Sequence, residues 1–154
     1  MLLFKQPDFR DGELDLYPIH VAPADRRLGF GQECVWRITL RNQKKEIGRI
    51  SYRAGESQGI YYFGHIGYHI DPPWQGHGYA RKACQLIRNE ILRGGKSSVI
   101  ITCDPDNEAS RKTCVHLGCL LEGEVSVPET LQKRFDISAR KLRFIWVLTP
   151  QDGE

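Results

Sequence analysis

Apolar and polar residues alternate along two neighbouring segments in the first third of the chain. Residues 34–40 and 46–53 both show this period of two, and both are rich in residues that favour strands. The polar segment 41–45 lies between them and is typical of a turn. We therefore predict an antiparallel hairpin, preceded by a first strand at about residues 13–20.

A more aromatic segment, residues 60–70, predicts a further strand that contains Gly64 and Gly67. Glycine inside a strand often marks a bulge or a close approach by another group. The strand should stop at Asp71, because the two prolines that follow have no N–H to donate to a neighbouring strand.

Residues 78–93 predict an amphipathic helix that ends at Gly94. Its apolar face recurs at intervals of three and four residues and consists of Ala80, Ala83, Cys84, Ile87 and Ile91. A short and almost uninterrupted apolar segment follows at residues 98–103. A strand, a helix and a buried strand in this order indicate a parallel β-α-β crossover.

The remaining sequence predicts one more helix and two closing strands. The helix should run from an Asn107 cap to Leu117, since asparagine is among the best N-terminal capping residues. Residues 119–127 and 142–149 are expected to be strands, joined by the polar loop 128–141. Together these elements predict an α/β (α+β) fold. Its mixed, mostly antiparallel sheet should have about six to seven strands around the central crossover.

Composition restricts the class of protein. The 154 residues, of which 40% are hydrophobic, suit a single domain that spans residues 1–154. No apolar run approaches the ~20 residues of a membrane span, and residues 1–20 lack the apolar stretch of a signal peptide. The five cysteines include no CxxC pair, which fits neither a disulfide framework nor a zinc site. We therefore expect a cytoplasmic protein that binds neither a membrane nor a metal.

The charge balance argues against nucleic acid as a partner. Lys and Arg total 22 against 19 Asp and Glu, for a net charge of +3, and the basic residues are scattered rather than gathered in a stripe. A mildly positive field would instead help to gather a small anionic ligand.

The segment richest in chemical information, residues 75–80 (QGHGYA), lies between the strand 60–70 and the helix 78–93. The first turn of a helix has unpaired N–H groups and a partial positive charge, and glycines let a phosphate approach them without meeting a Cβ. Arg81 occupies the third glycine position of a dinucleotide-binding fingerprint, and the Gly-Lys-Ser/Thr of nucleotide hydrolases is absent. The loop therefore predicts a different phosphate- or pyrophosphate-bearing ligand.

Together with a second motif, this loop resembles the GNAT superfamily of N-acetyltransferases. Residues 75–80 are similar to the family's Arg/Gln-x-x-Gly-x-Gly/Ala acyl-CoA loop. Residues 107–110 (NEAS), followed by Leu-Gly at 117–118, are similar to its Asn-x-x-Ser/Ala helix. The likeness covers about residues 47–127, the expected CoA-binding core, and looks closest to the branch that acetylates the N-termini of ribosomal proteins. It implies a single GNAT-like domain with splayed parallel strands and with acetyl-CoA as cosubstrate.

The resemblance also implies how acetyl-CoA is bound. The diphosphate would lie on the N–H groups of the loop, and the pantetheine arm would pair with the end of the preceding strand, where one N–H would polarise the thioester carbonyl. Two arginines are the candidate partners for phosphate charge. The residues expected to contact acetyl-CoA are Tyr68, His69, Ile70, Gln75, Gly76, His77, Gly78, Tyr79, Ala80, Arg81, Asn107, Ser110 and Arg111.

The acid that assists the departing thiolate is left open between two residues. Many family members place a tyrosine seven residues after the motif asparagine in this role, whereas this chain has Cys114. Cys114 is one candidate, although a cysteine at this place can also simply pack beneath the helix. Ser110 is the alternative donor.

The base that receives the amine proton is also open. His65 and His69, four residues apart on the predicted strand, can titrate near neutral pH and would share one face if no bulge intervenes. The alternative is that both only form hydrogen bonds across the sheet. Glu33 and Glu46 are weaker candidates. A weak base favours α-amines, because deprotonation at pH 7 costs about 1.4 kcal/mol for a pKa of ~8 and roughly 4.6 kcal/mol for a lysine.

The expected acceptor is a primary amine on a small molecule or a peptide N-terminus. Residues 21–33 are too short for the two helices that the family usually places there, so we expect an acceptor groove that is open or completed elsewhere. The loop 128–140, or a neighbouring subunit in a homodimer, would complete it. Two other functions stay open: a non-catalytic acyl-CoA-binding or sensing domain, and an unrelated nucleotide-binding protein or interaction module.

Overall fold

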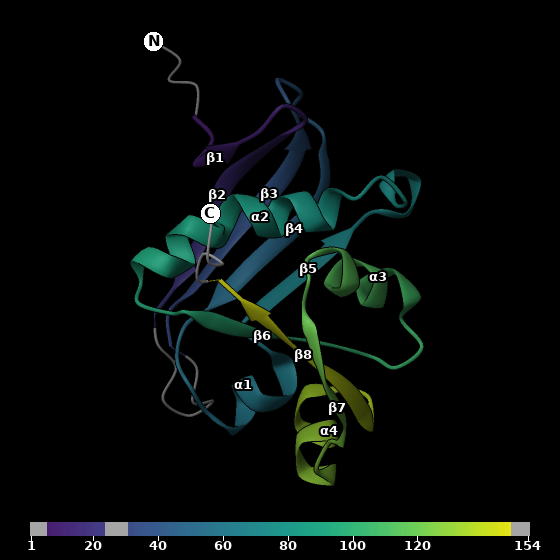
Figure 1. The fold of residues 1–154 in the computed structure, drawn as a ribbon. Coiled ribbons are helices and arrows are strands. Elements are labelled where there is room, and N and C mark those ends of the chain that lie inside the picture. The colour runs from purple at the N-terminus through teal and green to yellow at the C-terminus, as the bar shows by residue number, and fades with distance from the viewer. Residues whose placement is uncertain (1–5, 24–30, 149–154) are drawn as a thin grey trace.

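The fold was obtained as a computed structural model, which describes residues 6–23 and 31–148. Its larger sheet is antiparallel throughout and runs in chain order (Figure 1). The strands are β1 (Phe9–Arg10), β2 (Leu14–Ala22), β3 (Glu33–Leu40), β4 (Glu46–Arg53) and β5 (Ile66–Ile70). The predicted hairpin is confirmed as β3 and β4, in which Trp36 lies opposite Ile50.

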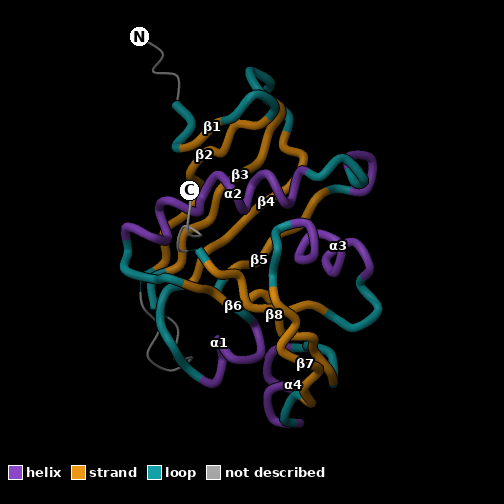
Figure 2. Tube along the Cα trace, viewed as in Figure 1, coloured by secondary structure: helices purple, strands orange, loops and turns teal. Residues whose placement is uncertain are grey.

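A second, three-stranded antiparallel sheet follows in the order β6-β8-β7. Its strands are β6 (Ser98–Cys103), β7 (Leu120–Ser126) and β8 (Arg140–Val147), close to the predicted bounds. The strands β5 and β6 run in the same direction but pair with different neighbours (Figures 1 and 2). Just before β5, Gly64 forms an isolated antiparallel bridge with Ile101 of β6, and β5 itself pairs with β4 and not with β6 among the described residues. The predicted α+β fold with a crossover between splayed strands is therefore confirmed.

The helix α2 (Tyr79–Arg93) connects β5 to β6 and lies across the five-stranded sheet (Figure 1). All of its predicted apolar positions are buried, namely Ala80, Ala83, Cys84, Ile87 and Ile91. They pack with strand residues such as Leu14, Ile38 and Ile50 in the main core. The spacing of three and four residues between apolar positions therefore predicted the buried face of this helix correctly.

The predicted strand 60–70 is wrong in its first half. Residues Gln58–Phe63 form a short helix, α1, whose start is capped by the Ser57 hydroxyl accepting from the Ile60 N–H at 3.1 Å. Gly64 ends the helix with a φ of 79°, a conformation that glycine adopts without strain, and β5 begins only at Ile66. A local cap and a glycine outweigh the aromatic residues that favoured a strand.

The predicted polar loop 128–141 contains a helix, α4 (Glu129–Phe135). An acidic residue lies in its first turn and basic residues in its last, which suits the helix dipole. The other predicted helix is confirmed as α3 (Glu108–His116), where Asn107 Oδ1 accepts from the Ser110 N–H at 3.2 Å. The short 3₁₀ helix η1 (Pro72–Trp74) follows β5.

The segment 21–33 was predicted to be too short for the two helices that the family usually places there. Its residues 24–30 lie outside the described residues. Across residues 6–23 and 31–148, no helix combines the length and apolarity needed to cross a bilayer.

Candidate active site

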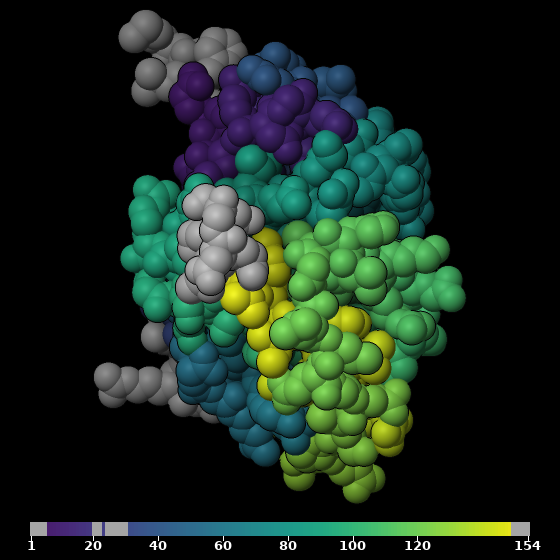
Figure 3. Space-filling model, viewed as in Figure 1, coloured from purple at the N-terminus to yellow at the C-terminus, as the bar shows by residue number. Residues whose placement is uncertain are grey.

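A cavity of about 570 Å³ lies where β5 and β6 part. Its wall is formed by the end of β5, the segment that leads into α2, and α3. On the face drawn in Figure 3, the segments that carry β5, η1 and the start of α2 border directly on the segment that carries α3. The predicted cofactor-binding residues that line it are Tyr68, His69, Ile70, Gln75, Gly76, Gly78, Tyr79, Ala80, Arg81, Asn107 and Ser110. Of the predicted set, His77 and Arg111 are not part of this wall.

The glycine loop has a backbone that other residues would adopt only with strain. Gly76 and Gly78 have φ values of 86° and 75°, in the left-handed region. A Cβ on Gly76 would meet nothing within 4 Å, so the loop faces open space. Gly78 caps α2 without any side-chain hydrogen bond to the first turn. The amides of that turn are thus available to an anion.

Arg81 adds charge to the same wall. Its Nε atom is buried and has no hydrogen-bond partner among the described residues. The guanidinium lies against the loop, since a Cβ on Gly78 would be 3.4 Å from Arg81 Nη2. Lys112 and His116 of α3 line the cavity as well. A buried donor without a partner beside open amides fits the phosphate groups of a nucleotide-like ligand.

One edge of β5 faces the gap. The Asp71 N–H donates to Ile47 O at 2.8 Å, so this residue's amide points toward β4. Because backbone groups alternate along a strand, those of Tyr68 and Ile70 point away from β4. In agreement, Ile70 O accepts from Gln75 Nε2 at 2.9 Å. By the same alternation, the backbone groups of His69 point toward β4, where His69 lies opposite Arg49.

A hydrogen-bonded pair closes the inner end of the cavity. The Tyr68 hydroxyl lies 2.7 Å from Ser110 Oγ and 3.9 Å from Cys114 Sγ. Burial raises the pKa of Tyr68 well above its ordinary value, so the phenol keeps its proton. If the phenol donates to Ser110 Oγ, the serine proton is left free for another acceptor.

A second cavity, of about 200 Å³, lies on the other side of this pair. Three residues line both cavities: Tyr68, Asn107 and Ser110. The second cavity is otherwise lined by Phe63, Ile66, Gly67, Thr102, Cys103, Asp104 and Lys141. The Tyr68–Ser110 pair, with Asn107, therefore forms a thin wall between the two spaces.

Asp104 is a residue of this site that the sequence analysis missed. Its Oδ1 accepts from Ser138 Oγ at 2.6 Å and from Lys141 Nζ at 2.7 Å. Burial acts to raise the pKa of Asp104, but the hydrogen bonds from Lys141 and Ser138 outweigh it and hold the pKa below its ordinary value. The signal in the sequence is its place directly after the buried strand 98–103, where polar residues often serve function.

The acetyltransferase (GNAT) domain family matches residues 13–120, more than half of the chain. The chain belongs to the GNAT acetyltransferase family. This confirms the resemblance drawn from the residues 75–80 and 107–110. No curated protein matches the chain.

Solved GNAT structures share this fold at low sequence identity. The self-immunity acetyltransferase MccE of microcin C7, in complex with acetyl-CoA and AMP, is 24% identical with a TM-score of 0.57; the alignment covers 75% of this chain and 61% of that one. A ribosomal-protein-S5-alanine acetyltransferase from Vibrio fischeri is 23% identical with a TM-score of 0.58, covering 77% and 64%. An acetyltransferase from Agrobacterium tumefaciens is 17% identical with a TM-score of 0.62, covering 95% and 97%. The chain thus spans less than two thirds of the length of MccE and of the Vibrio fischeri enzyme.

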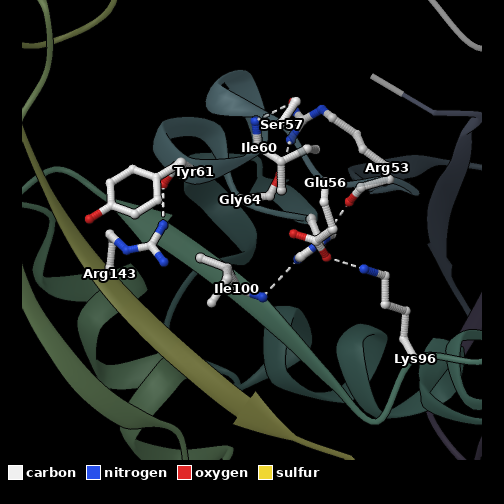
Figure 4. A network of polar contacts seen from close by, with 11 residues as sticks. Arg53, Glu56, Ser57, Ile60, Tyr61, Gly64, Lys96, Ile100 and Arg143 are labelled. Carbon is white, nitrogen blue, oxygen red and sulfur yellow. Dashed lines mark hydrogen bonds and ion pairs between the residues drawn. The ribbon is translucent and has the colours of Figure 1, made fainter. Parts of the chain in front are cut away.

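The structure places His65, predicted as a base, outside both GNAT cavities. It lies before β5 and is 2% exposed. Its Nδ1 accepts from the Ile100 N–H at 2.9 Å, and its Nε2 lies 3.0 Å from Glu56 Oε1, which also pairs with Lys96 (Figure 4). Burial lowers the pKa of His65. This residue directly follows the turn at Gly64, and its side chain is buried, whereas that of His69 is exposed.

The other candidates for proton transfer have different surroundings. His69 lines the first cavity, is 69% exposed and lies 3.3 Å from Asp71 Oδ1. Cys114 is fully buried behind the wall, and its hydrogen bond with Cys119, together with burial, raises its thiol pKa. Neither Glu33 nor Glu46 lines either cavity; they pair with Arg53 at 2.9 Å and Arg49 at 3.0 Å respectively, as side chains of the same sheet.

Proposed function

We propose that this protein transfers an acetyl group from acetyl-CoA to a primary amine by direct attack of the amine on the thioester. The observation that carries the proposal is the pair of cavities that meet at Tyr68 and Ser110. A cofactor in the first cavity and an amine in the second would meet at this thin wall. Membership of the GNAT acetyltransferase family supports the same chemistry.

The first cavity offers matching groups for each part of acetyl-CoA. The loop amides and Arg81 would hold the diphosphate, and Lys112 adds positive charge nearby. The free edge of β5 at Tyr68 and Ile70 would pair with the amide-bearing arm. When bound, acetyl-CoA supplies the acetyl group as a reactive thioester. The structural neighbour MccE was crystallised with acetyl-CoA.

Ser110 is the group best placed to assist the departing sulfur. In the transfer a nitrogen–carbon bond forms, the carbon–sulfur bond breaks, and the amine loses a proton. If the Tyr68 hydroxyl donates to Ser110 Oγ, the serine proton is free to donate to the thiolate. Cys114 is too deeply buried for this role. The thiolate is a good leaving group, so donation of a hydrogen bond suffices.

The groups around the second cavity favour an α-amine over a lysine side chain. Asp104, whose pKa lies below its ordinary value, is too weak a base to deprotonate a strongly basic amine. An α-amine of pKa ~8 reaches its neutral form at pH 7 for about 1.4 kcal/mol, through water alone. The Vibrio fischeri neighbour is named as a ribosomal-protein-S5-alanine acetyltransferase, which makes a peptide N-terminus one candidate acceptor.

The glycine loop provides the experiment. Gly78→Glu should abolish CoA binding in calorimetry, because it places a side chain and a negative charge where the diphosphate would lie. The matched control is Gly95→Glu: Gly95 also has a positive φ, of 97°, has no neighbour within 4 Å of a built Cβ, and lines neither cavity. This control should bind CoA normally. Normal CoA affinity in folded Gly78→Glu would contradict the proposal.

A non-catalytic acyl-CoA-binding domain is the second candidate. The observation that favours it is that Cys114 occupies the position of the family's usual acid and is buried. Incubation with acetyl-CoA and a panel of peptides and small amines distinguishes the two. An enzyme releases CoA in proportion to an acetylated amine, whereas a sensor binds acetyl-CoA and releases none.

A further inference from the structure

The second cavity contains a carboxylate oxygen that the proposed acetyl transfer does not use. Both hydrogen bonds to Asp104, from Ser138 and Lys141, go to Oδ1. Oδ2 accepts no hydrogen bond from any residue within the described ranges. The side chain is 44% exposed, so an incoming ligand can reach it.

The surroundings fix this carboxylate in an anionic state. Asp104 and Lys141 are the charged residues among those that line the second cavity. Lys141 is only 16% exposed and comes from β8, where its neighbour Leu142 lies opposite Cys103 of β6. Ser138 comes from the turn after α4, within the segment that was predicted to complete the acceptor groove. Two residues of one segment, more than thirty residues further along the chain, thus hold one oxygen of Asp104 and leave the other open.

We propose that Asp104 Oδ2 binds the ammonium group of the acceptor, which enters through the second cavity as a cationic primary amine. The inference rests on the proposed acetyl transfer and names its substrate class. An ammonium donates up to three hydrogen bonds and gains from a fixed anion in a partly buried site. A neutral alcohol or amide of the same size gains much less. The carboxylate of Asp104 therefore favours a cationic acceptor over a neutral one already at the binding step.

Asp104 acts here as an anchor and not as the base. A carboxyl of ordinary pKa ~3.9 holds a proton about four orders of magnitude more weakly than an amine of pKa ~8, and the contacts of Asp104 lower its pKa further. The ammonium therefore gives its proton to water after it has been positioned. Lys141 offsets part of the negative charge, which keeps Asp104 from stabilising the ammonium so strongly that it never deprotonates.

The test uses two probes that need no knowledge of the natural acceptor. In the first probe, the sulfur of CoA carries an alkyl chain of two, four or six carbons that ends in a primary ammonium. The matched probe has a chain of the same length that ends in a hydroxyl. Calorimetry should show that the wild-type protein binds the ammonium probe at least about tenfold tighter than the hydroxyl probe at one chain length. Asp104→Asn should remove this preference.

Asp106→Asn is the matched control, because Asp106 is exposed, lies two residues away and lines neither cavity. It should keep the preference. If Asp104→Asn alone fails to fold, the pair Asp104→Asn with Lys141→Gln removes both charges together and should show the same loss. Equal wild-type affinity for both probes at every length, or a preference that survives these substitutions, overturns the proposal. Failure of unmodified CoA to bind would instead contradict the proposed function itself.

Discussion

The two ends of the gap between β5 and β6 are built in opposite ways. At the closed end, the His65 N–H donates to Ile100 O at 2.8 Å, and the Ile100 N–H donates back to His65 Nδ1 at 2.9 Å. Thr102 Oγ1 adds a hydrogen bond to Tyr62 O at 3.0 Å. At the open end, the backbone edge of Tyr68 and Ile70 faces the first cavity. At the closed end the backbone groups pair across the two strands, whereas at the open end Ile70 O pairs only with the Gln75 side chain among the described residues.

This difference explains how two strands can stay apart without collapse. An open strand edge tends to pair with whatever lies beside it. Here the hydrogen bonds of the closed end hold the strands together, and beyond them the Tyr68 side chain of β5 contacts Ser110 of α3 instead of a neighbouring strand. The ion pair of Glu56 with Lys96 braces the closed end from outside (Figure 4). The hydrogen bonds between His65 and Ile100 must therefore stay intact for β5 and β6 to keep their separation at the open end.

The largest expected effect comes from removing the closed end. His65→Ala deletes a buried ring and leaves the Ile100 N–H without its acceptor, which should lower the free energy of unfolding by about 3 kcal/mol. His69→Ala is the matched control, because His69 is 69% exposed, and it should cost less than about 0.5 kcal/mol. Urea denaturation measures both. An equal loss in the free energy of unfolding in the two variants would show that His65 does not stabilise the closed end.

The open end is tested by Tyr68→Phe, which keeps the ring and removes the hydroxyl. Without this hydroxyl Ser110 Oγ loses its hydrogen-bond partner and is no longer held in place, so kcat for the best amine should fall about tenfold, or about 1.4 kcal/mol in the barrier. The affinity for CoA should change little, since the loop amides are untouched. The measurement is steady-state CoA release together with calorimetry.

Tyr62→Phe is the control for this hydroxyl. Tyr62 lies on α1, and its hydroxyl forms no hydrogen bond within the described part of the chain. Its kcat should match the wild type. If kcat in Tyr68→Phe also stays unchanged while KM rises, Tyr68 shapes the wall of the site but does not orient Ser110.

The residues around the first cavity were largely predictable because their signals are local. The helix α2 was predicted from the spacing of Ala80, Ala83 and Ile87, and its glycine loop from glycines at the helix start, which let a phosphate approach the amides without meeting a Cβ. Both depend on residues that are neighbours in sequence. The same holds for the Asn107 cap, which acts on an amide three residues away.

The second cavity and the closed end could not be predicted in this way. Asp104 meets Ser138 and Lys141 only because β6 pairs with β8, a contact between segments more than thirty residues apart. The residues 60–70 carry the aromatic content of a strand, yet the Ser57 cap and Gly64 turn the first part into α1. His65 directly follows the turn at Gly64, is buried and accepts a hydrogen bond from the Ile100 N–H, so it lies outside both cavities.

The smallest expected effect is the response of the closed end to pH. Burial lowers the pKa of His65 in the folded protein below its ordinary value of 6.5. The unfolded chain therefore binds this proton more readily, and the free energy of unfolding should be fully retained above about pH 6.5 and fall as the pH drops below it. Protonation would also remove the acceptor that the Ile100 N–H needs. Urea midpoints at pH 7.5 and 5.5 measure this loss of stability. The hydrogen bond with Lys96 is the main cause that lowers the pKa of Glu56, so this carboxyl stays ionised at pH 5.5 and does not contribute to the difference. His65→Gln, which does not titrate, should lose less stability over this interval than the wild type, whereas an equal loss would place the acid-sensitive group elsewhere.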